Sequence, residues 1–119
     1  MNWKLDDSRP IWPQLKEHMV KAIVAGQYPM GGGFPTVRDL AEEAGVNRNT
    51  MQRALSELES DGLVITNRTS GRTVTTDERL VAHMKESLAK ESVERFIEEM
   101  ASIGYGPADI IKMINEKGE

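Results

Sequence analysis

The chain contains no cysteine, which excludes disulfide bonds, cysteine-ligated zinc and a thiol nucleophile. It has no apolar run that approaches the ~20 residues needed to span a bilayer. Residues 1–7 also lack the apolar core that a signal peptide requires. We therefore expect a cytoplasmic protein that makes no contact with a membrane.

Histidine is scarce as well, since His18 and His83 are the only two and fall in different predicted elements. A metal site would require them to converge with carboxylates such as Glu17 or Glu86. The three glycines at 31–33 are not followed by the Gly-Lys-Ser/Thr of a phosphate-binding loop, and no serine lies in a strand-turn-helix nucleophile setting. We expect no catalytic residue, no metal, no cofactor and hence no enzyme.

Acidic side chains outnumber basic ones, 19 to 15, which gives a net charge of -4 over 119 residues. This excess lies after residue 76, because acidic and basic side chains balance over residues 1–76. Two segments of that first part, 47–56 and 62–76, carry arginines and no acid. Local charge matters more to a binding partner than the total. The acidic total therefore does not exclude nucleic acid as a partner.

Apolar side chains at three- and four-residue spacing predict three helices in the first 62 residues. Hydroxyl and amide side chains suit the N-cap positions of two of these helices, and glycines suit their ends. The predicted elements are a helix over 11–25, a loop over 27–35, a short helix capped by Thr36 and ended by Gly45, and a helix capped by Asn47 and ended by Gly62.

Residues 63–66 and 73–76 are rich in β-branched side chains and flank a turn signal, which predicts a small β-hairpin. Asp77 is expected to cap a long helix to about residue 103, and Pro107 to begin a last helix. The order helix, short helix, tight turn, helix and hairpin is typical of a winged helix-turn-helix.

The predicted fold is therefore mainly α with a small β-hairpin. Residues 1–76 form a winged helix-turn-helix DNA-binding domain, and residues 77–119 form a two-helix dimerisation segment. In this motif the third helix is the recognition helix, whose N-terminal residues meet base edges in the major groove. The alternative is an ordinary solvated helix face, but such faces usually mix charges of both signs, and 47–56 does not.

Four blocks of sequence carry a resemblance to a known family. They cover residues 10–15, 23–26, 35–41 and 45–64, in the right order and spacing. The sequence resembles the GntR family of bacterial transcription regulators. That resemblance implies a winged helix that binds operator DNA as a dimer. The short segment after residue 76 is similar to the YtrA-type subfamily, whose helical tail dimerises.

The resemblance also implies roles for single residues. Arg38 matches an arginine that contacts DNA from the start of the second helix, and Thr36 matches a hydroxyl residue near phosphate. The wing departs from the family pattern because it keeps one glycine and lacks the aromatic, although its two arginines supply charge. The predicted DNA-binding residues are Thr36, Arg38, Asn47, Arg48, Asn49, Thr50, Gln52, Arg53, Arg68 and Arg72.

The long helix after residue 77 carries more apolar side chains than the last helix can cover. Either it packs on its own winged helix or it meets a second copy, and we expect the second. The predicted dimerisation residues are Leu80, Met84, Leu88, Phe96 and Met100. We predict a sequence-specific transcription regulator, a repressor, bound as a homodimer to a pseudo-palindromic operator in double-stranded DNA. The alternative is a protein-interaction module that does not read DNA. The sequence identifies no small-molecule effector.

Overall fold

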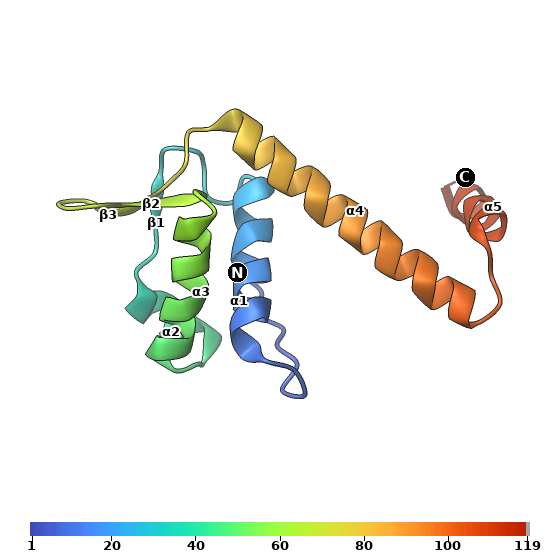
Figure 1. The fold of residues 1–119 in the computed structure, drawn as a ribbon, viewed down its shortest axis with the longest axis horizontal. Coiled ribbons are helices and arrows are strands. Elements are labelled where there is room, and N and C mark those ends of the chain that lie inside the picture. Colours follow the sequence, from blue (N-terminus) through green and yellow to red (C-terminus); the bar gives the residue numbers. More distant parts are fainter. Residues whose placement is uncertain (119) are drawn as a thin grey trace. The chain divides into compact units, whose positions relative to one another are not determined.

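The computed structural model describes residues 1–118 and is mainly helical. Its elements are α1 Ile11–Val24, β1 Gly33–Phe34, α2 Val37–Ala44, α3 Arg48–Ser60, β2 Val64–Asn67, β3 Gly71–Val74, α4 Glu78–Ser102 and α5 Pro107–Gly118 (Figure 1). The fold is the predicted one, a winged helix-turn-helix followed by two helices. Contacts divide the chain into two compact units, one from Met1 to Lys85 and one that begins at Glu86.

The first unit has one apolar core. α1 and α3 lie side by side, and α2 packs against α3 (Figure 1). Each helix buries the apolar face that its spacing predicts, and the two longer strands close the core. The most deeply buried side chains are Leu15, Met19, Leu40, Met51, Leu55, Leu58, Leu63, Val64 and Val74. An ion pair on the surface joins α1 to the end of α3, with Lys16 Nζ 2.8 Å from Asp61 Oδ2.

The N-caps predicted for the two helices of the helix-turn-helix are confirmed. Thr36 Oγ1 accepts a hydrogen bond from the Asp39 amide at 3.1 Å, and Asn47 Oδ1 accepts one from the Asn49 amide at 2.7 Å. Each bond satisfies an amide that the first helical turn leaves without a partner. Between the two helices Gly45 has φ of 70°, a left-handed conformation that a glycine adopts without strain. The tight turn of the helix-turn-helix is thus set by two local signals, Gly45 and Asn47.

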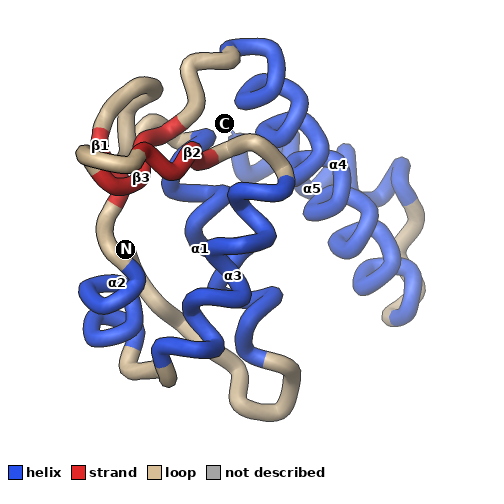
Figure 2. The backbone as a smooth tube through the Cα atoms, turned by 60° about the vertical axis from the view of Figure 1, so that its left-hand side comes forward, coloured by secondary structure: helices blue, strands red, loops and turns tan. Residues whose placement is uncertain are grey.

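The sheet has three strands, and the sequence predicted two. β1 pairs antiparallel with β3, with Gly33 opposite Thr73 and Phe34 opposite Arg72, and the strand order is β1-β3-β2 (Figure 2). The prediction of a simple loop over 27–35 was wrong at this point. A two-residue strand has no alternating pattern of its own, and it forms here on the edge that β3 offers.

The hairpin strands are also shifted from their predicted bounds of 63–66 and 73–76. Gly71, predicted as part of the turn, is the first residue of β3 and pairs with Asn67. The connecting turn therefore has three residues, 68–70, followed by a glycine at φ 75°. A loop of this length is common in hairpins, and the glycine after it takes a left-handed conformation that other residues adopt only with strain. The hairpin is the wing of this fold.

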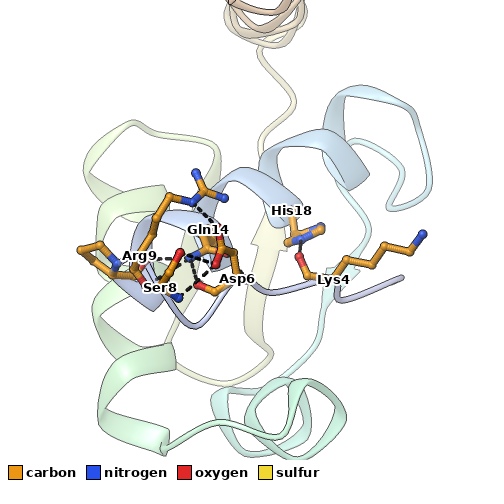
Figure 3. A network of polar contacts seen from close by, with 7 residues as sticks. Lys4, Asp6, Ser8, Arg9, Gln14 and His18 are labelled. Atoms are coloured by element: carbon orange, nitrogen blue, oxygen red, sulfur yellow. Dashed lines mark hydrogen bonds and ion pairs between the residues drawn. The ribbon is translucent and has the colours of Figure 1, made fainter.

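Hydrogen bonds to one buried side chain, Gln14, hold the segment before α1 against that helix (Figure 3). Its Oε1 accepts a hydrogen bond from the Asp6 amide at 2.7 Å, and its Nε2 donates to the carbonyl oxygens of Asp6 and Pro10 at 2.8 and 3.0 Å. Asp6 also accepts from Ser8 and Arg9, and these bonds lower the pKa of its carboxyl. The first ten residues are thus part of the first unit.

The helices of the second unit expose much of their apolar surface. α4 buries no side chain, and α5 buries Ile110. The start of α4 belongs to the first unit: Leu80 is half-buried, and its Cδ2 would lie 3.4 Å from a Cβ built on Gly62. The two compact units therefore divide within α4, after the predicted domain boundary at residue 76. None of the helices within residues 1–118 has both the length and the apolar character that a membrane span requires.

Candidate nucleic-acid interface

The N-terminal half of α3 presents a polar surface to solvent. Because Asn47 caps the helix with its own side chain, the next two residues, Arg48 and Asn49, lie in the first turn, and both are exposed. Gln52 is half-buried, and its Nε2 donates to Ser56 Oγ at 3.2 Å. This surface offers guanidinium and amide groups, which are the groups that form paired hydrogen bonds to guanine and adenine.

Two further predicted residues of α3 have neighbours within the first unit. The guanidinium carbon of Arg53 lies 4.5 Å from the ring centroid of Trp12, at the start of α1. This cation–π contact directs the Arg53 side chain along the surface toward α1. Thr50 is half-buried and, with Asn47, lines an open pocket of about 500 Å³ that reaches Trp3 in the N-terminal segment.

The start of α2 places Thr36 and Arg38 at the surface. Thr36 uses its hydroxyl as the helix cap. Arg38 Nε lies 3.4 Å from Glu42 Oε1 one turn along the helix, and the Arg38 side chain is 67% exposed. Exposed pairs of this kind contribute little free energy. The guanidinium of Arg38 can therefore leave Glu42 for a phosphate at small cost.

The two wing arginines have different surroundings. Arg68 lies in the exposed turn between β2 and β3. Arg72 lies on β3 with its side chain only 18% exposed, and its Nε donates to Glu59 Oε1 of α3 at 2.6 Å. Thr66 Oγ1 donates to the same oxygen at 2.9 Å. These two hydrogen bonds, that of Arg72 first, lower the pKa of Glu59.

Glu59 was missed by the sequence analysis. Its partners lie 7 and 13 residues along the chain, so no helical or strand spacing connects them. They meet because the hairpin folds back along the last turn of α3. No local signal in the sequence marks this residue.

The predicted dimerisation residues fall on both sides of the division within α4. Leu80 and Met84 belong to the first unit and are half-buried, as are Leu88 and Met100 in the second. Phe96 is 43% exposed. It lines an apolar groove of about 280 Å³ between α4 and α5, a feature that we name the tail groove. Its lining residues are Val93, Phe96, Ile97, Pro107, Ile110, Ile111 and Ile114.

His18, one of the two histidines, has a structural role in the first unit. The ring of His18 packs edge-on against Trp3, with 5.5 Å between centroids, and its Nε2 lies 3.1 Å from the Lys4 carbonyl oxygen (Figure 3). Within residues 1–118, no three histidine or carboxylate side chains are grouped so that they could hold a metal ion.

The chain is similar to known transcription regulators in both sequence and fold. The model of the bacterial regulatory proteins of the gntR family matches residues 13–74. The HTH-type transcriptional regulator YhcF of Bacillus subtilis is 30% identical over 114 residues, which cover 96% of this chain and 94% of that protein. A solved GntR family transcriptional regulator from Listeria monocytogenes is 36% identical, with a TM-score of 0.85 over 94% of this chain and 98% of that chain.

The similar solved structures include a complex with operator DNA. The DNA-binding domain of AraR in complex with operator ORX1 is 26% identical, with a TM-score of 0.53, and the match covers 63% of this chain and 92% of that chain. The DNA complex thus concerns the winged-helix part of the fold, whereas the relatives from Bacillus and Listeria also match the tail.

Proposed function

Because the chain belongs to the GntR family of bacterial regulatory proteins, whose members are DNA-binding transcription regulators, we propose that it is a repressor. In this proposal a homodimer binds a pseudo-palindromic operator in double-stranded DNA. The observation that carries the proposal is the exposed first half of α3, which has arginine and amide side chains and no acid between residues 47 and 56. A helix with such a surface suits the major groove.

Each side chain has a role in this proposal. Arg48 pairs with a guanine, and Asn49 and Gln52 read an adenine or a neighbouring phosphate. Thr36, Arg38, Asn47 and Thr50 fix the register through the DNA backbone. Arg68 reaches phosphate or the minor groove from the turn of the wing. Arg53 contributes positive charge beside α1 while it remains on Trp12.

The second copy is proposed to cover the tail groove. Its walls are apolar, and Ile111 and Ile114 of the lining are more than half exposed, as is Ile103. A solvent-exposed patch of this kind on a small protein usually marks an interface. The interface that we propose includes Phe96, Leu88 and Met100 of α4. The matching two-fold symmetry of protein and operator then doubles the number of DNA contacts.

Repression is proposed to work by occupancy. A dimer that sits across a promoter excludes polymerase from that DNA and requires no further contact. The protein would act in the cytoplasm, where bacterial operators lie. We expect the purified dimer to bind its operator without an added small molecule.

The test is a selection of bound sequences from random duplex DNA with the full chain. The expected product is a palindrome whose half-sites lie about one helical turn apart. The Phe96→Glu variant serves as a control, because a monomer should recover a single half-site or nothing. If the protein retains no duplex DNA even at low salt, where electrostatic binding is strongest, DNA recognition is excluded and a protein-binding module becomes the better explanation.

A further inference from the structure

The wing has little apolar support beyond its base. Val64 and Val74, a directly opposed pair, are buried. None of the residues from 65 to 73 is buried. Apart from the backbone pairing of β1 with Thr73 and Arg72, the outer part of the hairpin must therefore be held by polar contacts or move freely.

Polar contacts are present on the face of the hairpin that looks toward α3. Side chains two residues apart along a strand share a face. Thr66 and Arg72, which are opposed across the hairpin, therefore lie on the same face as Val64 and Val74. Both donate to a single acceptor, Glu59 Oε1, at 2.9 and 2.6 Å. The contact begins where the apolar core ends.

A second contact stiffens the other face. Asn67 Nδ2 donates to Thr73 Oγ1 across the hairpin at 3.0 Å. This bond holds β2 to β3, but it does not reach a helix. Among the described residues, only the Glu59 contacts tie the outer hairpin to the helix that carries the DNA-facing surface.

We infer that Glu59 is a positioning residue for DNA binding: through Arg72 and Thr66 it holds the wing at a fixed angle to α3, so that Arg68 reaches the DNA. Arg72 then acts through Glu59 and not on a phosphate. The inference rests on the proposed operator binding, with Arg68 as the wing contact. According to this inference, a carboxylate beside the DNA-binding surface strengthens DNA binding.

The charge of Glu59 makes the inference testable by the sign of an effect. A carboxylate near DNA repels phosphates. Removing it should therefore strengthen DNA binding, unless the carboxylate also positions the wing. Glu59→Gln keeps the shape of the side chain and removes the charge. Glu57→Gln removes the same charge from the same helix turn, where no contact of the Glu57 side chain is seen in the described residues, and is the matched control.

The experiment measures operator affinity of the full chain for wild type, Glu59→Gln, Glu57→Gln, Arg72→Gln, the double variant E59Q/R72Q, and Glu59→Gln combined with Arg68→Ala. We expect Glu59→Gln and Arg72→Gln each to weaken binding about 3- to 10-fold. The double variant should bind no more weakly than either single one, and Glu57→Gln should bind at least as well as wild type. In the Arg68→Ala background, Glu59→Gln should have no further effect.

Each other outcome has a definite meaning. Operator binding by Glu59→Gln equal to or tighter than wild type overturns the inference, and so does a loss that persists without Arg68, since this would reflect general destabilisation. Thermal unfolding of each variant checks that it is folded at the assay temperature. Thr66→Val removes one of the two hydrogen bonds from an exposed position and should give a smaller loss in the same direction. If wild type itself binds no duplex, the proposed function fails, and the inference fails with it for a different reason.

Discussion

Arg48 is the first residue of α3, it is exposed, and no partner of its side chain is seen within residues 1–118. It can therefore meet a base without first breaking a contact. We predict that Arg48→Ala weakens operator binding by about 1–3 kcal/mol, because a bidentate pair with guanine contributes about that much discrimination. The measurement is the ratio of affinities for operator and random duplex at one salt concentration.

The control for this prediction is Lys112→Ala, which removes one positive charge from α5 and should leave the ratio unchanged. If Arg48→Ala instead weakens binding to the operator and to random duplex equally, Arg48 contacts phosphate and reads no base.

Single residues also show where sequence reasoning reaches its limit. The caps Thr36 and Asn47 could be predicted because each bonds an amide two or three residues away. The partners of Arg53 and Arg72, which are Trp12 and Glu59, could not, because they lie on other elements. An arginine in an acid-free segment indicates positive charge near a surface, and only tertiary packing decides what that charge meets.

The helix-turn-helix gives a prediction at the scale of an element, because Asn47 is both a cap and a predicted DNA contact. Asn47→Ala should lower the free energy of unfolding by about 1 kcal/mol through loss of the cap. Asn47→Asp caps equally well and adds a negative charge, which is favourable at a helix N-terminus. It should therefore keep the stability and still weaken operator binding, because the new charge faces phosphate.

Chemical unfolding and operator titration of the two Asn47 variants separate these effects. Wild-type affinity in a stable Asn47→Asp variant would remove this residue from the interface.

The wing gives a second prediction at this scale, in its dependence on pH. The pKa of Glu59 is lower in the folded protein, chiefly because of its hydrogen bond from Arg72. The stabilisation that the pair provides is therefore complete above the ordinary carboxyl pKa of 4.5 and is lost as pH falls through the lowered value. We expect wild type to exceed Glu59→Gln in unfolding free energy by less than about 1 kcal/mol near neutral pH. The difference should disappear in acid; a constant difference would show that charge is not its cause.

The elements themselves followed closely from local signals. Helix starts, the left-handed glycine and the hairpin could all be predicted, because each depends on neighbours in the chain. The strand β1 could not be predicted, since two residues are too few to show an alternating pattern. Its pairing partner, β3, is also separated from it in the sequence by two helices. A short edge strand of this kind forms only when the tertiary fold brings its partner strand alongside.

At the scale of the whole molecule, the prediction concerns the tail groove. Phe96→Glu places a charge in a groove with apolar walls, so the dimer should dissociate while the winged helix stays folded. Each half-site alone is too weak, so operator affinity should fall by about 100-fold or more. Sedimentation at micromolar concentration measures the first effect and operator titration the second.

Ser102→Glu adds the same negative charge to α4 at an exposed position on the helix face opposite Val93, Phe96 and Met100. This control should remain dimeric. A wild-type protein that sediments as a monomer and still binds its operator would contradict the proposed assembly.

The hydrogen bonds of Gln14 also provide a spectroscopic marker. Its side-chain NH₂ donates to the carbonyl oxygens of Asp6, Arg9 and Pro10, so both amide protons are shielded from water. In a heteronuclear NMR spectrum this pair should lie apart from the crowded resonances of exposed glutamines and exchange slowly with solvent. The marker would report whether the N-terminal segment stays docked while DNA is titrated, with no label on the face that binds.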